Sequence, residues 1–240
     1  MSDITFIIDG KEVQGRAGQT IMEAADDAGI YIPRLCYLKE LTPAGHCRVC
    51  TVYVNGRPQA ACTQPAAPGI VVENDTAELR TFRRNLIEML FVEGNHYCMF
   101  CQVSGNCELQ AIAYRFGIDH PRYPYLFPKR DIDMSHPDVL IDRDRCIMCG
   151  RCVRASKELD QKNVFQFIHR SIHKRLAVNA ADGLGRTELT AADRAPDVCP
   201  VGSLVRKGEA YLLPIGSRKY DSAPIGSEIE AKAISFGEGK

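Results

Sequence analysis

The feature that most constrains this chain is a run of three cysteines, Cys146, Cys149 and Cys152, with two residues between neighbours. Thiols at this spacing on a short loop converge on one point, as a cubane iron–sulfur cluster requires. In the bacterial ferredoxin run, a fourth cysteine followed by proline comes after three further residues. Here that position is Ser156, and the Cys-Pro pair of the chain lies at Cys199. The spacing therefore predicts one cluster that is closed by a remote ligand, Cys199.

Two alternatives compete with iron–sulfur ligation at this run. Cys-x2-Cys also forms half of a structural zinc site, but zinc ribbons pair two separate knuckles, and three equally spaced thiols do not divide in that way. A disulfide framework is disfavoured because the count of 11 Cys is odd and no secretory segment is evident. Iron–sulfur binding is the favoured interpretation, and zinc stays open.

The charge balance narrows the class of protein. The 30 basic and 30 acidic residues cancel, whereas a nucleic-acid-binding domain is expected to be strongly basic. No run approaches the roughly 18 apolar residues of a membrane-spanning helix, and the N-terminus lacks the pattern of a signal peptide. We therefore expect a cytoplasmic protein of two or three small domains that binds neither nucleic acid nor membrane.

Residues 1–78 have the pattern of a small sheet that grasps one helix. Asp9 and Asn55 each precede a glycine between β-rich runs, which is the strongest short signal for a hairpin. Thr20 and Glu23 form a capping box at the start of a short helix. The predicted strands cover residues 4–8, 11–14, 51–54, 58–62 and 70–72.

Four more thiols lie in this first domain, and their spacing is typical of a second kind of cluster. Gaps of ten, two and eleven residues separate Cys36, Cys47, Cys50 and Cys62. Plant-type ferredoxins bind a [2Fe-2S] cluster through Cys-x4-Cys-x2-Cys and a distant fourth Cys, so the first gap is longer here. A four-thiolate zinc site is the open alternative. His46 lies in the same loop, and we interpret it as a polar neighbour rather than a ligand.

A third set of candidate ligands lies between two predicted helices. Asp75 and Glu78 can cap a helix that ends near Gly94. Its apolar face would consist of Leu79, Phe82, Leu86, Met89 and Leu90. The candidate ligands that follow are His96, Cys98, Cys101 and Cys107. A second amphipathic helix would then bury Leu109, Ile112, Ala113 and Phe116.

From about residue 3 to 208 the chain resembles the N-terminal iron–sulfur part of the large NADH-quinone oxidoreductase subunit and the accessory-cluster region of iron-only hydrogenases. That family binds a [4Fe-4S] cluster through His-x3-Cys-x2-Cys-x5-Cys, whereas one residue separates His96 from Cys98 here. This shortening, the 240-residue length and the segment from Pro214 to Tyr220 look most like the small diaphorase subunits of soluble NAD-reducing nickel-iron hydrogenases. The resemblance implies that His96 and three Cys hold a [4Fe-4S] cluster.

A count of ligands points to His96 as well. Three clusters with four protein ligands each need one ligand more than the 11 Cys supply. Imidazole does ligate iron–sulfur clusters, and His96 lies two residues before Cys98. An open iron site, a [3Fe-4S] cluster, completion by His46 or water, and a purely structural role of His96 are the alternatives.

The sequence thus predicts an α+β protein of three cluster domains. A β-grasp [2Fe-2S] domain over 1–78 precedes a helical [4Fe-4S] domain over 79–118. Residues 119–138, rich in Pro, Tyr and Asp, are interpreted as an ordered connector. Residues 139–208 would form a ferredoxin-like [4Fe-4S] domain, with strands at 164–168 and 176–178. Residues 209–240 lack periodicity and are predicted to be an extended tail that orders against another subunit.

Other motifs in the third domain do not predict a second cluster, a dinucleotide site or a histidine metal site. Iron-only hydrogenases carry a second cluster here, and the resemblance implies that it is absent. The candidate positions hold Ser156, Asp193 and Asp197. Gly183-Leu-Gly185 begins like a dinucleotide fingerprint but lacks the third Gly. His169 and His173 stand four residues apart, yet their β-rich neighbours favour a surface strand over a metal-binding helix.

Four arginines lie close to the cysteine run in the sequence, namely Arg143, Arg145, Arg151 and Arg154. Positive charge near a net-negative cluster favours its reduced state. We therefore expect these residues to raise the potential of the Cys146 cluster, and a solvated basic face is the alternative.

Three clusters without a flavin, nucleotide or nickel-binding motif predict a relay for single electrons, a non-catalytic subunit of a larger enzyme. The resemblance implies two partners: a flavoprotein that carries FMN and the NAD site, and the small and large subunits of a nickel-iron hydrogenase. Together they would couple H2 oxidation to NAD+ reduction. The same relay could serve an NAD-dependent formate dehydrogenase or a respiratory NADH dehydrogenase. A zinc-stabilised structural adaptor is the alternative from another class.

Overall fold

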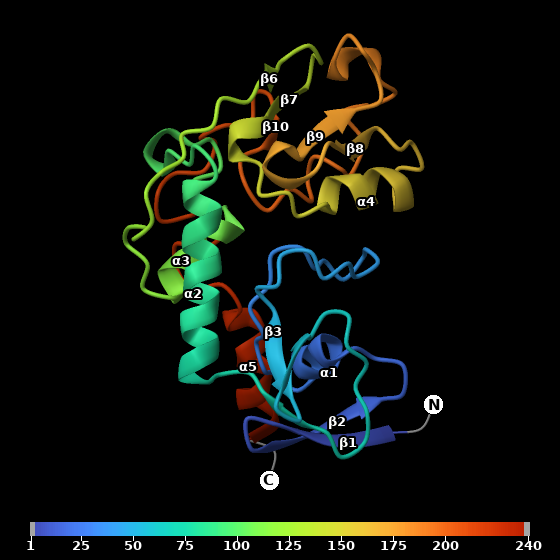
Figure 1. Ribbon diagram of the computed structural model, residues 1–240, viewed down its shortest axis with the longest axis vertical. Coiled ribbons are helices and arrows are strands. Elements are labelled where there is room, and N and C mark those ends of the chain that lie inside the picture. The colour runs from blue at the N-terminus through green and yellow to red at the C-terminus, as the bar shows by residue number, and fades with distance from the viewer. Residues whose placement is uncertain (1–2, 238–240) are drawn as a thin grey trace.

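The computed structural model describes residues 3–237, and three small bodies follow one another along the chain (Figure 1). The strands are β1 (Asp3–Ile8), β2 (Lys11–Arg16), β3 (Thr51–Val54), β4 (Arg57–Ala60), β5 (Val71–Glu73), β6 (Ile132–Asp133), β7 (Val139–Asp142), β8 (Phe165–Ile168), β9 (Arg175–Val178) and β10 (Leu204–Arg206). The α-helices are α1 (Ile21–Asp27), α2 (Ala77–Val92), α3 (Glu108–Arg115), α4 (Arg151–Glu158) and α5 (Ser227–Gly237). In the part of the chain that the structure describes, no helix combines the length and the apolar character needed to cross a membrane.

The first body is a mixed sheet that packs against α1, with strand order β2-β1-β5-β3-β4. Both predicted hairpins are confirmed: β1 pairs antiparallel with β2, and β3 with β4. Their turns have positive φ at both central residues, 49° at Asp9 and 48° at Asn55, each followed by a glycine. This is the backbone that such turns require, and Gly adopts it without steric cost. The parallel pairing of β1 with β5 then closes the sheet across α1.

The capping box at the start of α1 is also as predicted. The Thr20 hydroxyl accepts a hydrogen bond from the Glu23 amide at 3.2 Å, and the Glu23 carboxylate accepts one from the Thr20 amide at 2.8 Å. The helix buries Ile21 and Met22 completely against Phe6 and Ile8 of β1. Each such side chain contributes about 1.5–3 kcal/mol on removal from water.

The second body consists of α2 and α3. Thr76, rather than the expected Asp75, caps α2 with its side chain. The predicted apolar face is wrong in part, because Phe82 and Met89 are exposed. The face that α2 buries includes Arg83, 2% exposed, whose guanidinium donates to the carbonyls of Val49, Thr51 and Asn74 in the first domain. A buried charge satisfied by several carbonyls is sequestered at a tolerable cost, and here it joins α2 to the sheet.

The third body combines α4 with two small sheets. Strands β10, β7 and β6 form one sheet, and the β8–β9 hairpin forms the other. The strands predicted at 164–168 and 176–178 correspond to β8 and β9. β6 lies inside the predicted connector and pairs with β7, which ties that segment to the third body. A core of Val139, Ile141, Phe165, Leu176 and Leu204 lies beneath α4.

The C-terminal segment differs from the expected extended tail. Residues 227–237 form α5, which lies between α2 and the first sheet in Figure 1, and the last three residues of the expected tail lie outside the described range. Arg115 of α3 donates to the Ile225 carbonyl at 2.8 Å and pairs with Glu230. A Cβ at Gly226 would lie 2.4 Å from the Tyr31 ring, so this segment packs directly on the first domain. Contacts of this kind depend on distant residues, which explains why local periodicity missed the helix.

Candidate metal centres

The four thiols of the first domain gather in one place. Cys36 follows α1, Cys47 and Cys50 precede β3, and Cys62 follows β4. Positive φ at Gly45 (64°) and Arg48 (59°) curls the loop around Cys47. The Cys36 amide donates to Cys47 Sγ at 3.4 Å. Hydrogen bonding to Cys47, and then to Cys62, lowers the pKa of the Cys36 thiol. The same hydrogen bonds raise the pKa of their partners Cys47 and Cys62, so the thiolate, which is the species that ligates iron, is favoured at Cys36 and not at all four sulfurs.

In the third body, the cysteine run and the remote Cys199 share a cavity. Cys146, Cys149, Cys152 and Cys199 line it together with apolar side chains. Positive φ at Met148 (53°) and Gly150 (72°) bends the loop. Burial raises the pKa of the Cys149 thiol to about 12. Neutral thiols are favoured there, and cluster iron would supply the positive charge that stabilises thiolates. The sequence therefore placed Cys199 beside the run correctly, although it is distant along the chain.

The third set surrounds the turn between α2 and α3. Cys98 begins a short 3-10 helix, Cys101 follows it, and Cys107 precedes α3. Burial raises the pKa of the Cys107 thiol most, and negative charge on the neighbouring Cys101 and Cys98 raises it further. His96 lies before them with its ring edge against Phe91, at 5.5 Å between centroids.

The His96 side chain has the properties of a ligand without a partner. Its Nε2 atom is buried and makes no hydrogen bond. Burial, followed by the charge of Arg145, lowers the pKa of the ring to about 4, so the imidazole is neutral. A buried ring nitrogen without a partner is costly, and a neutral imidazole offers the lone pair that a metal takes. The residues present therefore fit an iron–sulfur cluster.

Among the described residues, no group of three or more His, Cys, Asp or Glu side chains is arranged to hold a single metal ion. What the structure does show is a set of hydrogen-bonded thiols in the first body, thiols that line one cavity in the third, and, in the second, an unpartnered imidazole that precedes three thiols along the chain.

Two of the four arginines near the cysteine run act on its thiols, because burial raises the pKa of Cys146 and Cys149 and the charges of Arg143 and Arg151, respectively, partly oppose this. Arg151 and Arg143 are 2% and 5% exposed, so the alternative of a solvated basic face is wrong for them, and their effect on the potential stays a prediction. Arg151 binds both Glu108 carboxylate oxygens, at 2.6 and 2.7 Å, and the Tyr37 carbonyl at 2.8 Å. Arg154 donates to the Cys36 carbonyl at 2.5 Å. These side chains join the three bodies to one another.

The loops that carry the thiols also meet directly. His46 Nδ1 lies 3.3 Å from the carbonyl oxygen of Cys149. The Glu108 amide, next to Cys107, donates to the carbonyl of Pro200, next to Cys199, at 2.9 Å. Each of these contacts was beyond the reach of sequence spacing, because the partners are about a hundred residues apart.

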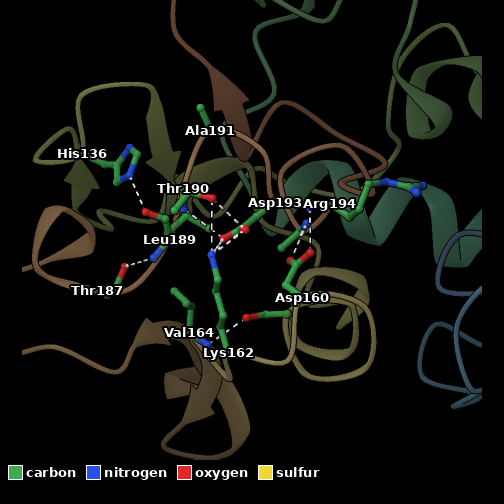
Figure 2. A network of polar contacts seen from close by, with 12 residues as sticks. His136, Asp160, Lys162, Val164, Thr187, Leu189, Thr190, Ala191, Asp193 and Arg194 are labelled. Atoms are coloured by element: carbon green, nitrogen blue, oxygen red, sulfur yellow. Dashed lines mark hydrogen bonds and ion pairs between the residues drawn. The ribbon is translucent and has the colours of Figure 1, made fainter.

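Ser156, Asp193 and Asp197, the positions considered for a second cluster from the resemblance, make polar contacts within the third body. Lys162 Nζ contacts both Asp193 carboxylate oxygens at 2.7 and 2.9 Å, and Thr190 donates to the same carboxylate (Figure 2). The Val164 amide donates to the buried Ser156 hydroxyl at 2.8 Å. Asp197 pairs with Arg206. Each of the three side chains therefore has a polar partner within the third body.

Two further motifs occupy local roles. The amides of Leu184 and Gly185 donate to the side chains of Asp133 and Ser135, both at 2.8 Å. The amides of this Gly-rich turn are therefore used in hydrogen bonds within the third body. His169 and His173 were expected on a surface strand, but they lie between β8 and β9. His169 has φ of 59° and follows β8 in the turn.

Three family models match these three bodies. A 2Fe-2S iron-sulfur cluster binding domain matches residues 2–77, the NADH-ubiquinone oxidoreductase-G iron-sulfur binding region matches 83–122, and the ferredoxin-like domain of NADH-quinone oxidoreductase subunit 3 matches 136–205. With the grouped thiols, they define an iron–sulfur electron-transfer protein. It has a 2Fe-2S domain followed by a 4Fe-4S-binding and a ferredoxin-like domain.

Comparison with whole proteins is more specific. The chain is 39% identical over 240 residues to NAD-reducing hydrogenase HoxS subunit gamma of Cupriavidus necator, with 99% of each chain covered. It therefore belongs to the family of that gamma subunit. It is 35% identical to NADP-reducing hydrogenase subunit HndD of Solidesulfovibrio fructosivorans, of which it spans 42%. A crystal structure of NAD+-reducing [NiFe]-hydrogenase in the H2-reduced state contains a chain with 44% identity and a TM-score of 0.92, and the match covers 97% of this chain and 99% of that one.

Proposed function

We propose that this chain carries single electrons through three clusters, between a flavoprotein that holds FMN and the NAD site and a hydrogenase module with the nickel-iron centre. The observation that carries the proposal is the presence of one ligand group in each body, with the loops of these groups in contact across the junctions. The full-length similarity to the HoxS gamma subunit supports the two partners. The chain has no catalytic residue of its own in this scheme.

The proposed ligands follow the three groups. Cys36, Cys47, Cys50 and Cys62 hold a [2Fe-2S] cluster in a domain over residues 1–78. His96, Cys98, Cys101 and Cys107 hold a [4Fe-4S] cluster over 79–118. Cys146, Cys149, Cys152 and Cys199 hold a second [4Fe-4S] cluster over 139–208, after the connector 119–138. Electrons pass between the first and third domains where His46 meets Cys149, and between the third and second where the loops of Cys199 and Cys107 meet.

The relay is tested by metal content and by electron flow. The complex purified with its native partners should contain about ten irons and matching acid-labile sulfide per copy of this chain beyond those of its partners. H2 should reduce all three clusters within the enzyme's turnover time, as seen by freeze-quench EPR. A colourless chain that holds zinc would indicate the structural adaptor. Co-purification with formate dehydrogenase or quinone reductase activity would indicate a different partner.

An exposed apolar face marks the docking side of the relay. Met99 and Phe100, in the turn of the His96 set, are 86% and 70% exposed. Tyr211 donates to the Phe100 carbonyl at 2.6 Å, which brings the exposed Leu212 beside them. Exposed apolar patches commonly mark contact sites, and an electron-transfer partner must approach a cluster closely. We assign this face to the hydrogenase module.

Phe100→Asp should weaken binding of the hydrogenase module about tenfold, equal to ~1.4 kcal/mol, because a charge would be buried in an apolar contact. The measurement is the dissociation constant between the chain in complex with its flavoprotein and the hydrogenase module. Ile172→Asp is the matched control, since Ile172 is also 86% exposed but lies in the β8–β9 turn. Equal weakening by both variants, or by neither, would show that the docking face lies elsewhere.

A further inference from the structure

Arg145 crosses from the third body to the second. It immediately precedes Cys146, yet its Nη1 atom lies 3.6 Å from Sγ of Cys101, in the set of His96. The same nitrogen donates to the side-chain oxygen of Gln102. On the other side, its Nε contacts the Asp142 carboxylate at 2.8 Å. The guanidinium therefore lies between its own domain and a sulfur of another.

The surroundings hold the guanidinium in this position. The Arg145 side chain is 15% exposed and that of Asp142 is 11% exposed, so the pair is largely shielded from water. Gly202 adjoins the contact: a Cβ there would lie 2.8 Å from Cys101 Sγ and 3.4 Å from Arg145 Nη1. Any side chain at position 202 would displace the sulfur or the guanidinium. The close approach of the two groups therefore depends on a glycine from the third body.

The Cys101 thiol here stands for the thiolate that would bind iron. When a [4Fe-4S] cluster accepts one electron from a neighbouring cluster, its net charge becomes more negative by one and no covalent bond need form or break. A hydrogen bond and a positive charge at a ligating sulfur stabilise the more negative state. Arg145 supplies both with little screening by water, and the Asp142 carboxylate at its Nε offsets part of the charge but leaves the hydrogen bond from Nη1 to the sulfur.

We propose that Arg145 is a positioning residue that raises the reduction potential of the cluster held by Cys98, Cys101 and Cys107, although it belongs to the loop of the Cys146 cluster. This inference rests on the proposed function, since it requires a cluster at Cys101. It also assigns the effect to one cluster, whereas a general positive field would shift both. The potential of the second body's cluster then depends on closure of the junction with the third.

Arg145→Met tests the proposal in the intact complex, with the midpoint potential of each cluster measured by redox-poised EPR. The equilibrium constant for reducing the Cys98–Cys107 cluster should fall about tenfold, which is ~59 mV for a one-electron couple. The Cys146 cluster should change by less than a third of that shift. Arg145→Lys, which keeps the charge, should give a smaller shift than Arg145→Met. Arg194→Gln, which neutralises an exposed ion pair with Glu40, should shift neither potential.

An unchanged potential of the Cys98–Cys107 cluster in Arg145→Met, or an equal or larger shift of the Cys146 cluster, would overturn the proposal. A second measurement does not depend on the variant's folding. In the wild-type complex grown with guanidino-15N arginine, pulsed EPR of the reduced Cys98–Cys107 cluster should show weak 15N coupling, and its absence would overturn the proposal. Failure of the proposed function has a different signature, because the wild-type complex would then lack this cluster's EPR signal altogether.

Discussion

His96→Ala should convert the [4Fe-4S] cluster of the second body into a [3Fe-4S] cluster or cause its loss. The reason is the state of the ring: Nε2 is buried and has no hydrogen bond. Burial lowers the pKa of the imidazole to about 4, which keeps the ring neutral and able to ligate iron. Gly94 leaves room for it, because a Cβ there would lie 2.6 Å from Nε2. Iron analysis and EPR of the intact complex should show about one iron fewer per chain, or about four fewer if the whole cluster is lost.

Two companion variants separate ligation from packing. His96→Cys should retain about ten irons while lowering the potential, because imidazole raises the potential of a cluster in which it replaces thiolate. His46→Ala should leave the [4Fe-4S] signal of the second body intact, since His46 contacts the Cys149 carbonyl in the third body and not the His96 set. An unaltered [4Fe-4S] spectrum and potential in His96→Ala would mean that another group completes the site.

Arg151→Met should open the junction of the three bodies. Arg151 is 2% exposed and binds Glu108 of α3 and the Tyr37 carbonyl of the first domain. Removing one partner of a buried ion pair leaves the other charge uncompensated and costs about 3–5 kcal/mol. Hydrogen exchange should show opening of the Glu108 and Tyr37 segments at least ~100-fold more often. This measurement suits the case because unfolding of a multidomain metalloprotein is not two-state.

The controls for this variant lie on the same two helices. Lys157→Met, at an exposed position of α4, should leave exchange at the junction unchanged. The double variant Arg151→Met, Glu108→Leu should recover part of the loss, because no unpaired charge remains in the junction. If Arg151→Met alone has no effect on exchange, the three bodies are held together by other contacts, such as that of Arg154 with the Cys36 carbonyl.

What the sequence could predict depended on the distance between interacting residues. The turns at Asp9 and Asn55 and the capping box at Thr20 were predicted correctly, because a few adjacent residues determine them. The clustering of Cys199 with the run at Cys146 was also predicted, since Ser156 occupies the position of the fourth cysteine and the Cys-Pro pair lies at Cys199. Few residue types can ligate a cluster, so few positions in the chain compete for the role of the fourth ligand.

The parts that could not be predicted involve side chains with many possible partners. Arg83 lies on the buried side of α2, where periodicity favoured apolar residues such as Phe82. An arginine finds carbonyls or carboxylates almost anywhere, so neither its burial nor its partner follows from neighbours in sequence. Arg145 is a further case, because it precedes Cys146 but contacts Cys101.

The position of α5 bears on how the protein is made. A chain leaves the ribosome from its N-terminus, and domains generally fold in that order. The first sheet and α3 are therefore complete before residues 225–230 emerge, yet Arg115 finds the Ile225 carbonyl and Glu230 only then. Gly226 likewise reaches the Tyr31 ring only after all three bodies have been synthesised. A product truncated by premature termination before residue 225 would lack these contacts with Arg115 and Tyr31. Its exposed surface there should be cleaved by a protease more readily than that of a chain that includes α5.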